Sequence, residues 1–310
     1  MVRTLIGFAL MLATGAPREP TQAPAADPAR PLQIEAVAFD SRGNPVRDLR
    51  AEEIEVWIGG ARIPIEMLVA VDASKDERDG RSVVVILDDI TVEPSLVPRI
   101  RQAARRLVTR VLPGDHVAIV GLEGDYGKTT SDQALLLRRV DEYNVRATSL
   151  LRPDDLGAYV LNTLAQVSRQ LAEAPGGRKT IVAIGSGWLF DRPIPPPIAG
   201  RDLQREWVEV MRAMASAHAS LYVIDPAGVG TALATGGSSG FARETGGHAF
   251  INTNDVNGAV DRILREASNY YLMTVTDPPI RRKAPLREVD VRSLRRGVTV
   301  RARRGIPGGG

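Results

Sequence analysis

The sequence predicts a doubly wound α/β fold, in which a mainly parallel sheet carries helices on both faces. Strand-like and helix-like segments alternate from residue 82 to residue 276, which is the pattern of such sheets. Residues 83–87 are five consecutive apolar β-formers, as expected for a strand that is covered on both faces. The chain has 310 residues and 44% of them are hydrophobic, which is sufficient for one α/β domain and an added module.

Residues 1–16 and 17–31 differ in composition from the rest of the chain. Arg3 is followed by a short apolar stretch and then by small residues, a combination typical of a secretory signal peptide. The apolar stretch is shorter than the ~20 residues that cross a bilayer. Residues 17–31 are rich in Pro and Ala without periodicity, which predicts a disordered linker. We therefore expect an exported protein, periplasmic or secreted, with no transmembrane span after signal removal.

Residues 32–80 are expected to form a small β module. Leu32–Phe39 has the composition of a strand. Gly59-Gly60 is typical of a two-residue hairpin turn between the strands Ile54–Ile58 and Ala61–Ile65.

Residues 81–276 are expected to form the α/β domain. The predicted strands are Ser82–Leu87, His116–Leu122, Lys179–Gly185, Ser220–Ile224, His248–Ile251 and Tyr270–Thr276. The predicted helices are Pro94–Val111, Gln133–Glu142, Asp154–Ala172, Asp202–Ala217, Gly240–Glu244 and Asp255–Ala267. Pro94 suits the first turn of a helix, and apolar residues then recur on one face. Asp154 favours the cap and the dipole of the third helix.

Residues 277–310 are expected to form a basic β-hairpin with a flexible end. Leu286–Arg292 and Gly297–Arg303 alternate apolar and charged residues on either side of a polar turn. Because a lone hairpin is marginally stable, we expect it to pair with the β module of residues 32–80. Its arginines could bind an anionic polymer, or form a solvated face that discourages edge-to-edge pairing. The lack of aromatic residues in this tail argues against nucleic acid as a partner.

Composition and motifs exclude several kinds of chemistry. The chain has no cysteine, which excludes disulfides, thiolate zinc sites and cysteine nucleophiles. Residues 121–129 are glycine-rich, but Leu122 replaces a glycine of the phosphate-binding loop motif, so we expect no nucleotide site. An unrecognised hydrolase that uses Ser186 with His218 or His248 is the one enzymatic alternative.

Six short motifs, considered together with their order and spacing, indicate a family. They are Gly43–Leu49, Val83–Asp89, Leu112–Ala118, Glu244–Phe250, Tyr270–Leu272 and Val298–Gly305. In this arrangement the chain resembles the von Willebrand factor type A domain, and most of all the secreted "VWFA-related" proteins common in Acidobacteria. The resemblance implies a Rossmann-like sheet and protein–protein recognition or adhesion through loops at the carboxyl ends of its strands. It implies a binding protein rather than an enzyme.

The resemblance also implies a metal-ion-dependent adhesion site, with the form Asp-x-Ser-x-Ser after the first strand. Asp88 takes the place of the first Asp, but Ile90 and Val92 stand at the serine positions. A register shifted by one residue places oxygen-bearing side chains at the same spacing. The candidate ligands of Mg²⁺ or Mn²⁺ are Asp88, Asp89, Thr91, Glu93, Thr148 and Ser186, with Ser149, Asp154 and Asp155 as alternatives to Thr148. Asp88 and Asp89 could instead cap the following helix and bond to loop amides.

Two loops are expected to complete the binding surface. Trp188, Leu189 and Phe190 begin a long Pro-rich loop after the third strand, and Gly228 lies in a Gly/Ser-rich loop on the same rim. The sequence therefore predicts an exported binding protein with a degenerate metal site and an unknown protein partner in the envelope or outside the cell. A metal-free scaffold subunit of an envelope complex is the alternative.

Overall fold

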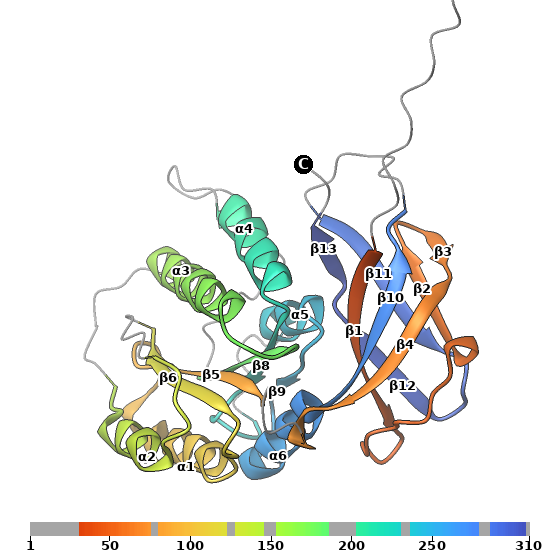
Figure 1. The fold of residues 1–310 in the computed structure, drawn as a ribbon. Helices are drawn as coiled ribbons and strands as arrows, with labels where there is room; N and C mark the ends of the chain where they lie inside the picture. Colours follow the sequence, from red (N-terminus) through yellow and green to blue (C-terminus); the bar gives the residue numbers. More distant parts are fainter. Residues whose placement is uncertain are drawn as a thin grey trace, which may run out of the picture.

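The computed structural model describes residues 31–75, 80–122, 128–145, 153–185, 203–230, 236–278 and 286–307. It has two parts, which stand side by side in Figure 1. One part is a five-stranded parallel sheet flanked by helices, and the other is a sandwich of two four-stranded antiparallel sheets. The predicted α/β fold is confirmed at this level.

The parallel sheet has the strand order β6–β5–β7–β8–β9. Its strands are β5 (Ser82–Leu87), β6 (His116–Gly121), β7 (Lys179–Ile184), β8 (Ala219–Ile224) and β9 (Ala249–Phe250). All four neighbouring pairs are parallel. Every residue of β5, β7 and β8 is buried, as expected for apolar strands with helices on both faces.

Among the described helices, three cover each face of this sheet. Those on one face are α1 (Val97–Val108), α2 (Gln133–Glu142) and α6 (Val256–Ser268). Those on the other face are α3 (Pro153–Ala172), α4 (Leu203–Ser216) and α5 (Gly236–Glu244). Alternate residues of β5 belong to the two cores, because successive side chains of a strand point to opposite faces. None of the described helices combines the length and the apolar character that a bilayer crossing requires.

The sandwich is built from both ends of the chain. One sheet has the order β12–β1–β10–β4 and the other β13–β11–β2–β3. The strands are β1 (Pro31–Asp40), β2 (Ile54–Ile58), β3 (Ala61–Ile63), β4 (Ile65–Asp72), β10 (Asn269–Thr276), β11 (Leu286–Ser293), β12 (Val298–Ala302) and β13 (Gly305–Pro307). Three short 3-10 helices are η1 (Ala51–Glu53), η2 (Ala73–Lys75) and η3 (Pro94–Leu96). The predicted hairpin at Gly59-Gly60 is confirmed by the pairing of β2 with β3.

Two expectations about strand pairing are wrong. The segment Tyr270–Thr276 was expected to be the last strand of the α/β domain, but β10 pairs antiparallel with β1 and β4 in the sandwich. Its alternate residues Tyr271, Met273 and Val275 are buried in the sandwich core, which is the pattern of a one-sided sheet rather than of a strand buried on both faces. This alternation is the physical reason that the strand belongs to the sandwich and not to the parallel sheet.

The expected C-terminal hairpin is also wrong, and its two strands pair instead with different strands of the N-terminal segment. β11 pairs with β2 and β13, whereas β12 pairs with β1 in the facing sheet. The two strands bury their apolar residues, Val289 and Val291 on β11 and Ala302 on β12, from opposite sides of one core. A hydrogen-bonded hairpin would place both strands in one sheet, so it could not enclose that core.

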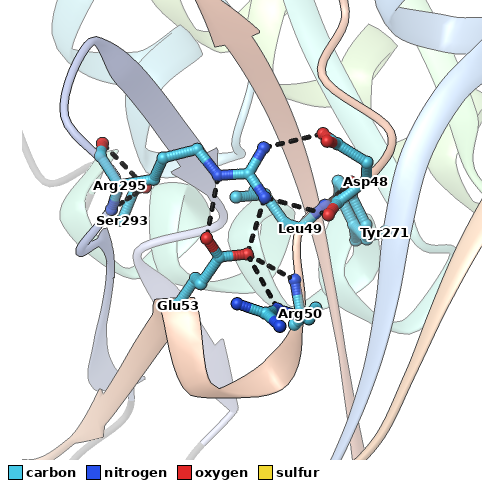
Figure 2. Close-up of polar contacts among 7 residues, drawn as sticks. All are labelled: Asp48, Leu49, Arg50, Glu53, Tyr271, Ser293 and Arg295. Carbon is cyan, nitrogen blue, oxygen red and sulfur yellow. Dashed lines mark hydrogen bonds and ion pairs between the residues drawn. The ribbon is translucent and has the colours of Figure 1, made fainter.

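Arg295, in the turn between β11 and β12, fixes the sandwich at one end (Figure 2). Its Nε donates to Glu53 Oε1 at 2.9 Å and its Nη2 to Glu53 Oε2 at 2.6 Å. Its Nη1 donates to Asp48 Oδ1 at 2.7 Å. The Leu49 amide beside Asp48 donates to the Tyr271 hydroxyl at 3.0 Å. The contacts join three segments that are far apart in the sequence.

The two parts meet near Gly246-Gly247, two of the four residues between α5 and β9. Gly246 has φ +81°, and a Cβ on it would lie 2.8 Å from the Arg303 amide nitrogen. A Cβ on Gly247 would lie 1.7 Å from the Leu221 carbonyl oxygen. The Arg304 amide donates to Glu244 O at 3.0 Å, and Arg301 Nε donates to Gly246 O at 3.2 Å. Gly246 is therefore required because the chain at Ala302 and Arg303 approaches its backbone closely, and Gly247 because β8 does.

Candidate functional site

The loop after β5 lies at the topological switch point of the parallel sheet. β6 and β7 flank β5, and the helices α1 and α3 that lead to them cover opposite faces. The Asp88 amide donates to the Ile184 carbonyl at the end of β7 at 3.0 Å, so the carboxyl ends of β5 and β7 are joined at this point. Open α/β sheets bind their ligands at such a position. Asp88 and Asp89 thus lie at the carboxyl edge of the sheet, at its switch point.

Asp88 is fully buried, and its carboxylate is bonded by its own loop. Oδ1 accepts from the Ile90 amide at 3.1 Å and the Thr91 amide at 2.8 Å, and Oδ2 accepts from the Thr91 hydroxyl. Burial raises the pKa of Asp88 to about 6, although the Thr91 and Ile90 donors lower it. The Tyr143 hydroxyl donates to the Asp88 carbonyl at 2.6 Å, and burial raises the pKa of that tyrosine too.

The Asp89 carboxylate faces a different strand. Its Oδ1 accepts from the Leu122 amide at the end of β6, at 2.9 Å. A Cβ on Gly121 would lie 2.7 Å from Asp89 Oδ2, so the glycine leaves room for this carboxylate. The Thr163 hydroxyl of α3 donates to the Leu122 carbonyl at 2.9 Å. Asp89 thus ties β5 to β6, whereas Asp88 holds the loop that follows β5.

These bonds agree with the alternative in which Asp88 and Asp89 bond to loop amides. The helix-capping part of that alternative is not found, since η3 and α1 begin without a side-chain cap. Neither aspartate is therefore needed to start the helix.

The described residues do not fit a divalent cation as they stand. Thr91 is engaged with Asp88, and Glu93 is exposed, with Oε2 3.5 Å from the Ser95 hydroxyl. Thr148 and Ser186 lie outside the described residues. Within the ranges that the structure covers, no group of three or more histidines and carboxylates could hold a metal. An ion at Asp88 would have to displace Thr91 donors from the carboxylate.

Only one of the two expected partner-binding loops can be followed. Trp188, Leu189 and Phe190 are not among the described residues. Gly228 lies on the rim after β8, with φ +86°, and a Cβ on it would lie 2.4 Å from Asn254 Oδ1. Arg99 of α1 reaches the same loop, with Nη1 3.4 Å from the Ala227 carbonyl. The start of this loop is thus anchored to α1 and to the turn before α6.

Of the residues named for a hydrolase, Ser186 lies outside the described residues, whereas His218 and His248 are described. His218 precedes β8 and its carbonyl accepts from the Lys179 amide, so it lies at the amino edge of the sheet. Gly185, the last described residue before Ser186, lies at the opposite edge, a strand of six residues away. His248 is packed edge-on against Phe250 at 4.8 Å, and burial, with Arg301 and Arg262, lowers its pKa to about 4.

A cavity that the sequence did not point to lies at the amino edge of the sheet. It is lined by residues from the linker end, both parts of the fold and the C-terminal strands, among them Glu35, Arg178, His218 and Arg303. Arg178, which is buried, and Arg303, which is half-buried, come from separate segments, so no local sequence pattern predicts their approach. The only available signal was Arg178 itself, a charged residue directly before a wholly buried strand.

No protein-family model matches this sequence, and no curated protein matches it. The strand topology alone therefore defines the fold, as a parallel five-stranded α/β sheet compatible with a Rossmann-like fold and accompanied by antiparallel sheets.

Proposed function

We propose that this chain is an exported, von Willebrand factor type A-like binding protein that recognises a protein partner and is not an enzyme. Recognition takes place at the carboxyl rim of the parallel sheet, through the loop after β5 and the loops that contain Trp188 and Gly228. The observation that supports this most is the position of the Asp88 loop at the topological switch point. The predicted signal peptide supports export.

The contacts of Asp88 favour recognition that does not depend on a metal. Both of its oxygens accept hydrogen bonds from the loop, so the carboxylate shapes the rim from beneath instead of facing a partner. The exposed side chains that could meet a partner are those around it, such as Glu93 and Val229, the latter 60% exposed. A partner would then bind the surface of this loop, while Asp88 maintains its shape.

A metal-free subunit of an envelope complex is the second candidate. It is favoured by the edge strand β4, which exposes Met67 (52%) and Val69 (41%) at the end of its sheet. Exposed apolar side chains on an unpaired strand edge suit a lasting interface. Size measurement of the complex from envelope extracts, before and after Met67→Lys, separates this candidate from rim recognition.

The test of the rim combines Asp88→Asn with metal titration of the full chain. The asparagine keeps an acceptor for the two loop amides and removes the buried charge. Because the carboxyl pKa rises from 3.8 in the unfolded chain to about 6 in the fold, the native state carries a penalty that develops between these pH values and persists above them. We expect the variant to be more stable at pH 7, by at most about 3 kcal/mol at 1.36 kcal/mol per pKa unit.

Thermal unfolding is then measured with EDTA, Mg²⁺ and Mn²⁺, with Glu52→Gln as the control for loss of an exposed carboxylate. We expect neither ion to change the midpoint. A rise with Mg²⁺ that Asp88→Asn abolishes would mean a working adhesion site and an acidic group on the partner.

Partner capture tests the function itself. Trp188→Ala and Val229→Glu should each weaken capture of the partner, and Met67→Lys should not. If both rim variants capture as well as the wild type, rim recognition is wrong. Labelling by a serine-directed probe would instead favour a hydrolase.

A further inference from the structure

A cavity of about 350 Å³ lies between the α/β part and the sandwich. It opens where β1, the end of α4 and the C-terminal strands approach one another. Its walls include Leu32 and Glu35 of β1, Arg178 before β7, His218 before β8, and Arg303 and Ile306 at the C-terminal side. It lies at the amino edge of the parallel sheet, so it is separate from the rim proposed above.

Two arginines in this cavity have buried N–H groups without an acceptor. Arg178 is only 4% exposed, and its Nε has no hydrogen-bond partner. The Nη1 of Arg303 likewise has none. Their other contacts hold the guanidinium groups in place: Arg178 Nη2 lies 3.2 Å from Gly246 O, and Arg303 Nη2 donates to Ala219 O. These acceptors are neutral carbonyls, which position a guanidinium group without cancelling its charge.

The cavity has more positive than negative charge. Glu35 is the carboxylate among its lining residues, and it lies 3.2 Å from His218 Nδ1. Glu266, which also acts on Arg178, is paired with Arg262 and Arg301. Burial lowers the pKa of Arg303 to about 10, with Glu35 opposing and Arg178 adding to this effect. Arg178 and Arg303 therefore share Glu35 as the carboxylate of the cavity wall, which leaves an excess of positive charge there.

We propose that this cavity binds a small organic monocarboxylate. A guanidinium group offers paired donors that match a carboxylate, and one negative charge balances the excess positive charge. A phosphate dianion would place a second negative charge near Glu35, whose side chain is only 11% exposed. Leu32, Ala215 and Ile306 provide apolar wall for the body of the ligand. The volume is that of a small-molecule site, for which about 300–1,000 Å³ is typical.

The test compares butyrate and benzoate with their neutral amides, using the full chain at constant ionic strength. The carboxylates should raise the thermal midpoint in a saturable manner, and butyramide and benzamide should not. The Nε–H resonance of Arg178 in a ¹H–¹⁵N spectrum should shift on titration with the carboxylate, because a negative charge then lies beside its guanidinium group. If neither carboxylate raises the thermal midpoint more than its amide does, the proposal is wrong. It is also wrong if inorganic phosphate binds more tightly than both carboxylates.

Three variants locate the binding. Arg303→Gln should weaken carboxylate binding roughly tenfold or more, since a charged hydrogen-bond donor is lost. Glu35→Gln should tighten it, because the opposing charge is removed. Arg296→Gln, a change of an exposed arginine outside the cavity, should leave it unchanged. Should Arg303→Gln not fold, the tighter binding expected for Glu35→Gln, against no change for Arg296→Gln, still decides. Equal affinity of wild type and Glu35→Gln would overturn the assignment.

Discussion

At the scale of single residues, the ion pair of Glu53 and Arg295 stabilises the fold near neutral pH, and this contribution is lost in acid. The Arg295 hydrogen bonds, helped by the Arg50 amide, lower the pKa of Glu53 from 4.5 to about 2. A carboxylate whose pKa is lowered in the fold contributes stability that is present above its unfolded pKa. That contribution is lost as the pH falls through about 4.5 toward about 2.

Glu53→Gln should therefore be less stable than wild type at pH 7 and should lose less stability between pH 5 and pH 2.5. Urea midpoints across this range measure the difference. Glu52→Gln, an exposed neighbour, should follow the wild-type curve. Parallel curves for Glu53→Gln and wild type would show that the contact in Figure 2 does not persist in solution.

Single residues also show how far the sequence defines the candidate site. The place of Asp88 and Asp89 could be predicted, because acidic residues directly after an apolar strand must lie at its carboxyl end. Their roles could not, since these depend on which amide each oxygen meets: Thr91 in the same loop for Asp88, and Leu122 on β6 for Asp89. Arg178 and Arg303 come together only through the packing of the two parts.

At the scale of elements, prediction succeeds where local signals agree. α2 has the predicted bounds, because Asp132 caps it by accepting from the Leu135 amide at 3.0 Å and its apolar face has the helical period. β4 was not predicted beyond Ile65, since it exposes several residues and shows little alternation. β10 was assigned to the wrong sheet because sequence order placed it after α6, while its pairing partners lie some 200 residues earlier.

The link between α5 and β9 offers a test of one element pair. A Cβ on Gly247 would meet the Leu221 carbonyl oxygen at 1.7 Å and its carbon at 2.6 Å, and both are backbone atoms of β8. β9 would have to move from β8, so Gly247→Ala should destabilise the protein by about 1–3 kcal/mol, the usual range for overpacking. The free energy of unfolding in urea measures this loss.

Gly240→Ala is the matched control within α5. Nothing lies within 4 Å of its added Cβ, and alanine is favoured over glycine in a helix by about 0.5–1 kcal/mol. The control should therefore stabilise the protein. A loss of stability in both variants would mean that α5 does not take the place described.

At the scale of the whole molecule, the sandwich and the α/β part are continuous with each other. The chain enters through β1, builds the parallel sheet, and returns through β10 to complete the sandwich. Arg301 of β12 forms an ion pair with Glu266 of α6, and its guanidinium lies 5.4 Å from the Phe39 ring of β1. Both charged side chains are largely buried, at 14% and 7% exposure. The interface is therefore an internal packing surface.

Because of this interface, we expect both parts to unfold in one transition. Trp57 lies in β2 of the sandwich and Trp207 in α4, so variants that keep one of the three tryptophans report on each part separately. Their urea midpoints should coincide in the wild type.

Arg301→Gln leaves Glu266 without one of its arginines, and breaking a buried pair costs about 3–5 kcal/mol. The two midpoints should then separate, with the sandwich unfolding first because it loses the contact that holds β12 to the helices. Coincident midpoints in the variant would place the coupling elsewhere, and separate midpoints in the wild type would contradict it.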